Sequence, residues 1–211
     1  MTGWRTVSVA PERLAGWIAR FADRHRPVES SLDRYTVIIT GADGAVAMIQ
    51  VAFPPLLLTG DLLASTVDHG LRSRRIGAVL VRKGGFAVGI FEGNRLVTSK
   101  VGSAYVQGKT KAGGWSQQRY ARRRDNQAKK AYAEAADEVV HLLLPARDDL
   151  EVIVTGGDKP AVAAVFEDPR AAVLRALVTG PVLAVPDPRL RVLQAFPEQF
   201  RAVTIRLNGL A

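Results

Sequence analysis

The feature that most constrains the fold is an apolar stretch from position 76 to 102, IGAVLVRKGGFAVGIFEGNRLVTSKVG. It is rich in β-branched and small apolar residues, which favour strands. Gly84–Gly85 and Glu92–Gly93–Asn94 divide it into three short runs, and both divisions have the composition of tight turns. The stretch therefore predicts three antiparallel strands that form a meander.

The flanking segments alternate between helical and extended patterns. Residues 11–25 repeat apolar side chains at three- and four-residue steps, which predicts an amphipathic helix within an N-terminal helical segment, 1–30. A Gly-Ala-Asp-Gly turn indicates a hairpin over 34–53, and 26–33 has the composition of a loop. We further expect helices at 60–75, 159–168 and 168–178, and strands at 150–157, 181–187 and 200–207.

These elements predict an α/β (α+β) fold with a mixed, largely antiparallel sheet flanked by helices. At 211 residues, with 47% hydrophobic residues, the chain can bury a full core. No repeat or linker stands out, so we expect a single domain, 1–211.

A glycine-rich loop, 103–118, and a helix, 117–140, follow the meander. Along the helix, Ala121, Ala128, Ala131, Tyr132, Ala135 and Val139 fall on one face. Basic and polar residues fall on another face at helical spacing: Arg119, Arg122, Arg123, Asn126, Lys129 and Lys130. The first half is thus a basic ridge, and the second half is a scaffold element.

Positive charge is concentrated in the same region. The net charge is +9, and between Lys109 and Lys130 eight Lys or Arg residues oppose Asp125 alone. Such a local excess favours a polyanionic partner, with nucleic acid first and an anionic membrane surface second. A generally basic, solvated surface is the plainer alternative.

The composition disfavours several other classes of function. The chain has no cysteine, which excludes disulfides and thiolate metal sites, and its three histidines lack metal-ligand spacing. We expect no bound metal and no cofactor, although carboxylate binding of Mg²⁺ stays open. The sequence shows no signal peptide and no apolar run of about 20 residues, which predicts a cytoplasmic protein without a membrane partner.

Gly108-Lys109-Thr110 raises the possibility of a phosphate-binding loop for a nucleotide. That motif requires four residues between its two glycines and a helix that starts at the Lys. Here five residues separate Gly102 from Gly108, and two glycines interrupt the segment that should be helical. The spacing therefore disfavours a nucleotide site.

A glycine-hinged loop on a basic helix fits the segment better. Gly113 and Gly114 permit positive φ and a close approach to another molecule. Trp115 could stack on a base, whereas Gln117 and Gln118 offer neutral amides that can orient water or hydrogen-bond a base. The alternative is a plain connection between a strand and a helix.

The segment KTKAGGWSQQRYARRRDNQAKKAYAEAADE resembles the catalytic loop and following helix of eukaryotic and archaeal class-I translation termination factors. Their Gly-Gly-Gln motif precedes an Arg-aromatic-Ala-Arg run, which Arg119–Arg122 matches. Here Trp115 follows the glycines. Gly114-Trp115-Ser116-Gln117 instead fits the Gly-x-x-Gln signature of the Vms-like release factors, and essentially the whole chain resembles the actinobacterial Vms-like family of peptidyl-tRNA hydrolases.

The resemblance implies an RNase H-like sheet and a catalytic domain that releases nascent chains from peptidyl-tRNA on stalled large ribosomal subunits. It implies that Gln117 positions the attacking water, or Gln118 if the register of the loop shifts by one residue. Gly113 and Gly114 would let the loop backbone approach the ester closely. We expect a monomer whose partner is RNA rather than DNA. Its contacts would come from Trp115, Lys109, Lys111, Arg119, Arg122, Arg123, Arg124, Lys129 and Lys130.

Two alternatives stay open. One is an endonuclease that cuts the tRNA near its 3′ end, although Asp43, Asp61, Asp68 and Glu92 are scattered along the sequence. The other is a non-catalytic protein that binds RNA or the ribosome. A further basic group either extends the electropositive face or is simply solvated surface: Arg72, Arg74, Arg75, Arg82 and Lys83.

Overall fold

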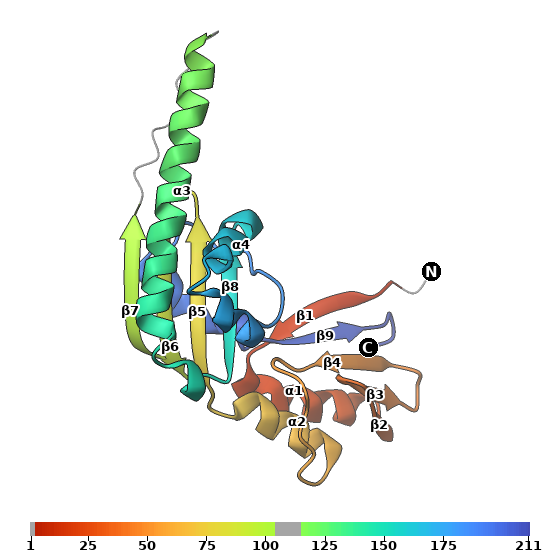
Figure 1. Cartoon of the computed structure of the whole chain (residues 1–211). Helices are drawn as coiled ribbons and strands as arrows, with labels where there is room; N and C mark the ends of the chain where they lie inside the picture. Colours follow the sequence, from red (N-terminus) through yellow and green to blue (C-terminus); the bar gives the residue numbers. More distant parts are fainter. Residues whose placement is uncertain (1–2, 104–114) are drawn as a thin grey trace. The chain divides into compact units, whose positions relative to one another are not determined.

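The computed structural model describes residues 3–103 and 115–211, and the side chains of residues 115–127 lie outside the description. The chain forms two compact units (Figure 1). The first unit comprises Met1–Arg72 and Pro197–Ala211, and the second comprises Ser73–Phe196. The last strand of the chain returns to the first unit, which a division by sequence position cannot anticipate.

The first unit contains a five-stranded antiparallel sheet in the order β1-β9-β4-β3-β2. The expected hairpin is β3 (Thr36–Gly41) with β4 (Val46–Gln50), and the expected last strand is β9 (Val203–Leu207). Gly44, with φ of 84°, lies in the turn between β3 and β4. All three strands alternate inward-facing apolar residues with more exposed ones, which is the reason that the sequence revealed them.

Two helices and the sheet enclose the core of the first unit. Helix α1 (Pro11–Arg24) begins with Pro11 in its first turn and buries Leu14, Ile18 and Phe21. Helix α2 (Leu62–Leu71) is capped by Asp61, whose side chain accepts from the Ala64 N–H at 2.9 Å. The expected helices at 11–25 and 60–75 are therefore present.

The two edge strands of this sheet, β1 and β2, were not predicted from the sequence. The segment interpreted as a loop contains β2 (Val28–Asp33), which pairs with β3 along its whole length. Strand β1 (Arg5–Val9) pairs with β9. All but one of the β2 side chains are exposed, so β2 lacks the apolar alternation that marks a half-buried strand. In β1, Val7 and Val9 alternate with exposed Thr6 and Ser8, but two apolar residues are too short a pattern to have revealed the strand.

The second unit contains the predicted meander, extended by one parallel strand. Its sheet has the order β7-β6-β5-β8, with β5 (Arg75–Arg82), β6 (Gly85–Glu92) and β7 (Arg95–Ser103) pairing antiparallel. Strand β8 (Val152–Gly157) pairs parallel with β5. The fold class is therefore α+β with an antiparallel sheet and a mixed sheet, as predicted.

Helices cover this mixed sheet. Helix α3 (Trp115–Leu143) and helix α4 (Lys159–Glu167) lie on the face seen in Figure 1. Helix α5 (Leu190–Ala195) contacts β6 and β7, and a Cβ on Gly89 of β6 would lie 3.0 Å from Leu193. Because β6 is enclosed in this way, nearly all of its residues are buried. No helix in the described ranges is long and apolar enough to span a membrane.

Two expected elements differ in the structure. Over the predicted helix 168–178, the chain forms the 3₁₀ helix η2 (Ala172–Leu177). Over the predicted strand 181–187, it forms an isolated bridge between Leu183 and Gly156 instead of a strand. The pattern PVLAVPD is apolar, but Pro181 and Pro186 lack the N–H that a ladder needs. The other short segments are η1 (Arg147–Asp149) and α6 (Pro197–Phe200).

Candidate functional site

The predicted loop 103–118 leaves the sheet of the second unit from the end of β7. In the β6–β7 register, Gly102 pairs with Phe86 and Ser103 pairs with Gly85. A Cβ on Gly102 would overlap the Phe86 ring, which is 5% exposed and belongs to the core. A Cβ on Gly85, with φ of 149°, would overlap the Gly102 carbonyl oxygen. The start of the loop is therefore fixed by two glycines and one aromatic ring.

The loop itself lies outside the described residues. The glycines and lysines expected to act there, Gly113, Gly114, Lys109 and Lys111, fall within it. Helix α3 includes the backbone of Trp115, Gln117, Gln118, Arg119, Arg122, Arg123 and Arg124, whose side chains are likewise outside the description. The assignments of these residues remain predictions.

Helix α3 is anchored by its C-terminal half, as the sequence analysis proposed. Its buried residues begin at Ala128 and continue through Ala131, Ala135, Ala136, Val139 and Leu143, and it contacts β6, β7 and α4. At about 1.5 Å per residue, its 29 residues span about 43 Å. Figure 1 shows that the helix continues past the ends of β5 and β7. The basic half predicted from the sequence therefore extends beyond the sheet.

The two described lysines of the predicted basic face are solvent-exposed. Lys129 and Lys130 are both exposed, and the Lys130 side chain is 80% exposed. Lys130 Nζ lies 3.9 Å from Glu134 Oε1, one turn further along the helix. An exposed pair at this distance contributes little to stability, so both ammonium groups can reach a polyanion.

Arg170 connects α3 to the end of α4. Its Nη2 atom donates to Asp137 of α3 at 2.6 Å and to Asp168 at 2.7 Å, and its Nε donates to Asp168 at 3.0 Å. The Arg170 side chain and backbone N–H together lower the pKa of Asp168 to about 2. Sequence analysis missed this connection, because Asp137 lies 33 residues before Arg170 and no motif links the two.

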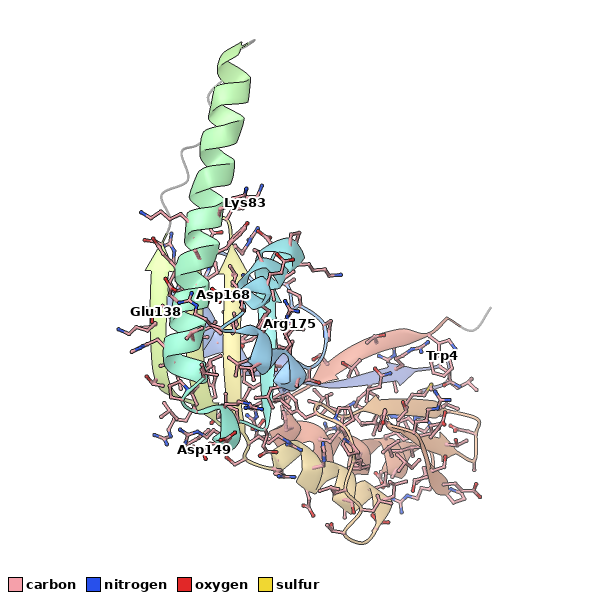
Figure 2. All side chains as sticks on the ribbon, viewed as in Figure 1. Trp4, Lys83, Glu138, Asp149, Asp168 and Arg175 are labelled. Carbon is pink, nitrogen blue, oxygen red and sulfur yellow. The ribbon has the colours of Figure 1, made fainter. Side chains whose placement is uncertain are left out.

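The second basic group from the sequence does not form one continuous face. Lys83 is exposed in the β5–β6 turn, beside the start of the loop, where Figure 2 labels it. Arg82 also lies at this end of the sheet, but it pairs with Asp158 at 3.4 Å and Asp187 at 3.7 Å. Its charge is therefore offset locally.

The remaining arginines of this group lie at other places. Arg74 and Arg75 are at the opposite end of β5, where Arg74 is 6% exposed with its Nε 3.8 Å from Glu151. Arg75 donates to Glu92 at 3.2 Å. Arg72 is exposed just after α2, in the first unit. The five residues therefore do not form one electropositive face.

The carboxylates considered for a metal nuclease are also dispersed. Asp61 caps α2, and Asp43 contacts His25 at 2.7 Å in the first unit. Glu92 pairs with Arg75 and Arg95 at the end of β6. Asp68 is exposed on α2. In the described part of the chain, no group of three or more His, Cys, Asp or Glu residues could hold a metal ion.

Strand β7 is followed by the loop 103–118 and then by the long, partly basic helix α3. This order of elements is the one that the resemblance to translation release factors led us to expect. Residues 74–206 match the family described as the Actinobacteria/chloroflexi VLRF1 release factor. The match covers more than half of the chain and includes the meander, the loop and α3. This protein therefore belongs to that release factor family, as the Vms-like resemblance of its sequence predicted.

Two solved structures are similar to the chain at low sequence identity. The crystal structure of the archaeal translation termination factor aRF1 shares 16% identity over 87% of this chain and 55% of that one, with a TM-score of 0.40. A structure described as an archaeal protein shares 16% identity over 84% of this chain and 51% of that one, with a TM-score of 0.34. The chain thus spans about half the length of these structures.

Proposed function

We propose that the protein is a peptidyl-tRNA hydrolase that frees nascent chains from stalled large ribosomal subunits. The observation that carries the proposal is the family match over residues 74–206, which includes the glycine loop and α3. The partners would be the large subunit and peptidyl-tRNA, and the protein would act as a cytoplasmic monomer without a cofactor.

The reaction is the hydrolysis of an ester. Water attacks the carbonyl carbon that joins the peptide to the terminal ribose of the tRNA, and the carbon–oxygen bond to the ribose breaks. The products are a peptide with a free carboxyl group and a tRNA with an intact 3′ end. Gln117 would position the water through its side-chain or backbone amide, with Gln118 as the substitute if the register shifts.

The scaffold supports this chemistry by its shape and charge. An ester buried in ribosomal RNA is accessible only to a slim element, and Gly113 and Gly114 would let the backbone approach it. The loop starts at a rigid strand end, and α3 continues past the sheet next to it. The arginines at 119 and 122–124 would contact RNA phosphates, together with exposed Lys129 and Lys130.

The test uses large subunits that carry labelled peptidyl-tRNA. Wild-type protein should release the peptide and leave the tRNA intact, and Gln117→Ala should slow release by about a hundredfold or more, because a mispositioned water reacts slowly. Gln118→Ala decides which glutamine acts. Gln199→Ala, an exposed glutamine of the first unit, is the matched control and should retain full activity.

The products separate the alternatives. A shortened tRNA still attached to its peptide would assign the protein to the endonucleases and contradict the proposal. Binding without turnover by any of the proteins would leave a ribosome-binding factor, whose association would still depend on Arg122–Arg124.

A further inference from the structure

The first unit contains a pocket that the release-factor chemistry does not use. It has a volume of about 310 Å³ and lies between α1, the edge strand β1 and the end of β9. Four of its lining residues are arginines and two are aromatic: Arg5, Arg13, Arg20, Arg24, Trp17 and Phe21. All six precede residue 74, so they lie outside the segment that matches the family.

The helical repeat brings most of these side chains together. Arg13, Trp17, Arg20 and Arg24 follow one another at steps of four, three and four residues, which places them on one face of α1. The Arg20 guanidinium lies above Gly16, where a Cβ would come within 3.2 Å of Nη1. Arg5 enters from β1 and donates to the Ala211 backbone oxygen at 2.9 Å. One face of α1 and the strand β1 therefore form a basic lining on one side of the pocket.

The carboxylates of α1 do not neutralise the arginines that line the pocket. Glu12 accepts from Arg201 at 2.7 Å, and Asp23 pairs with Arg26. Within the described part of the chain, no carboxylate forms an ion pair with Arg13, Arg20 or Arg24. Like charges that share a pocket repel each other, so an anion that enters it would be bound favourably.

The clustering is not a by-product of a generally basic unit. The first unit contains nine arginines, no lysine and eight acidic residues, which leaves a net charge of only +1. Four of the nine arginines nevertheless line one pocket. Arginine suits phosphate better than lysine does, because its planar fork can donate two parallel hydrogen bonds.

The dimensions and the aromatic residues favour a polynucleotide over a single phosphate. Arg13 and Arg24 are eleven residues apart on the helix, or about 16 Å, which exceeds the reach of one phosphate group. Trp17 is half-buried between them and stacks on Phe21, with ring centroids 5.5 Å apart. A basic groove with an aromatic surface is the usual design for binding single-stranded RNA.

We infer that this pocket is a second RNA-binding site, in which Arg13, Arg20 and Arg24 contact successive phosphates of a single strand and Trp17 contacts a base. The choice of RNA over an acidic protein rests on the proposed function, which places the protein among ribosomal RNA and tRNA. The site would hold RNA at a surface separate from the loop 103–118, and it would not take part in the hydrolysis.

The test measures binding of a fluorescein-labelled 20-nucleotide single-stranded RNA at several salt concentrations to the full-length protein carrying Arg122→Gln, Arg123→Gln and Arg124→Gln. These three changes weaken the strongly basic segment Lys109–Lys130, which would otherwise dominate the RNA affinity. Arg13→Gln with Arg20→Gln should raise the Kd about tenfold and reduce the slope of log K against log salt by about 1.4, since each lost phosphate contact in a single strand removes about 0.7. Arg26→Gln with Arg206→Gln is the matched control. It removes the same charge from the first unit but from exposed arginines that do not line the pocket, and it should leave the slope unchanged.

Crosslinking locates the contact without any substitution. A 4-thiouridine-containing RNA should crosslink in the wild-type protein to the tryptic peptide Leu14–Arg20, which contains Trp17. Circular dichroism melting of both double variants shows that each is folded. An unchanged slope for the Arg13/Arg20 variant, or no crosslink to this peptide, would overturn the inference, as would competition by poly-L-glutamate as strong as that by poly(U).

The outcome does not depend on peptide release. Neither RNA binding nor crosslinking requires Gln117, so the inference can stand if the hydrolase proposal fails. Conversely, full release activity together with an unchanged salt slope would remove this site and leave the proposed function intact.

Discussion

At the residue scale, the contact of Gly102 with Phe86 fixes the point at which the loop begins. In the sequence, Gly102 resembled the first glycine of a nucleotide-binding loop, whereas in the structure it is the strand residue opposite Phe86. We predict that Gly102→Ala lowers the free energy of unfolding by about 1–3 kcal/mol, because the added methyl group displaces a packed ring. Peptide release should fall as well. Urea unfolding and the release assay measure the two effects.

Gly84 provides the control for this substitution. It lies in the adjacent β5–β6 turn, and a Cβ there would have its nearest neighbour, Asp187, at 3.8 Å. Gly84→Ala should therefore leave both stability and release close to wild type. Equal effects of the two substitutions would show that the glycines act through backbone freedom, and the role given to the Phe86 ring would be wrong.

At the scale of elements, α3 depends on small side chains to lie close to the sheet. Ala135 is fully buried in the core of the second unit, whereas Ala133, two residues earlier, is exposed. We predict that Ala135→Leu costs about 1–3 kcal/mol of stability by overpacking and slows release by shifting the helix that follows the loop. Ala133→Leu makes the same chemical change at an exposed position beside a pocket of about 220 Å³, where the larger side chain has room, and should be nearly neutral. Urea midpoints and release rates test both, and a destabilised Ala133→Leu would contradict the assigned burial.

Elements with a buried apolar face were predictable from the sequence, and those without one were not. The meander, the 34–53 hairpin and α1 were found because their apolar residues recur at strand or helix spacing. Strand β2 is an exposed edge strand, and only its pairing with β3 shows that it is a strand. Strand β1 offers just Val7 and Val9 as an alternating pair, and its pairing with β9 identifies it. Interactions between distant segments, such as Arg170 with Asp137, leave no local pattern. The candidate loop was recognised by its motif, whereas the arginine pocket needed α1 and β1 to be placed side by side.

At the scale of the whole molecule, the positive charge is divided unevenly between the units. The second unit carries +8 of the net +9, and the segment Lys109–Lys130 alone carries +7. The remainder of the chain is therefore close to neutral. RNA affinity should depend mainly on this segment, with the arginines of α1 as a smaller second contribution whose removal the salt slope detects.

The pH dependence of stability also follows from the whole molecule, because each unit has a carboxylate whose pKa is lowered. The hydrogen bond with His25 and then the Ala45 N–H lower the pKa of Asp43, and Arg170 lowers the pKa of Asp168 to about 2. A lowered pKa stabilises the folded state above the unfolded value, 3.8 for Asp, and that contribution disappears as pH falls through the folded value. The second unit should therefore lose the Asp168 contribution between pH 3.8 and about 2.

The variant Asp168→Asn isolates this contribution. It should melt below wild type at neutral pH, and the difference in Tm should stay constant down to about pH 5 and shrink to a small remainder at pH 2, where about half of the folded wild-type protein has a protonated Asp168. Asp148→Asn, an exposed side chain of η1, should show no comparable difference at any pH. Circular dichroism melts across this range make the measurement. If the gap between Asp168→Asn and wild type were as large at pH 2 as at neutral pH, the stabilisation could not come from the ionised carboxylate, and the connection of α3 to α4 through Arg170 would have to depend on Asp137 alone.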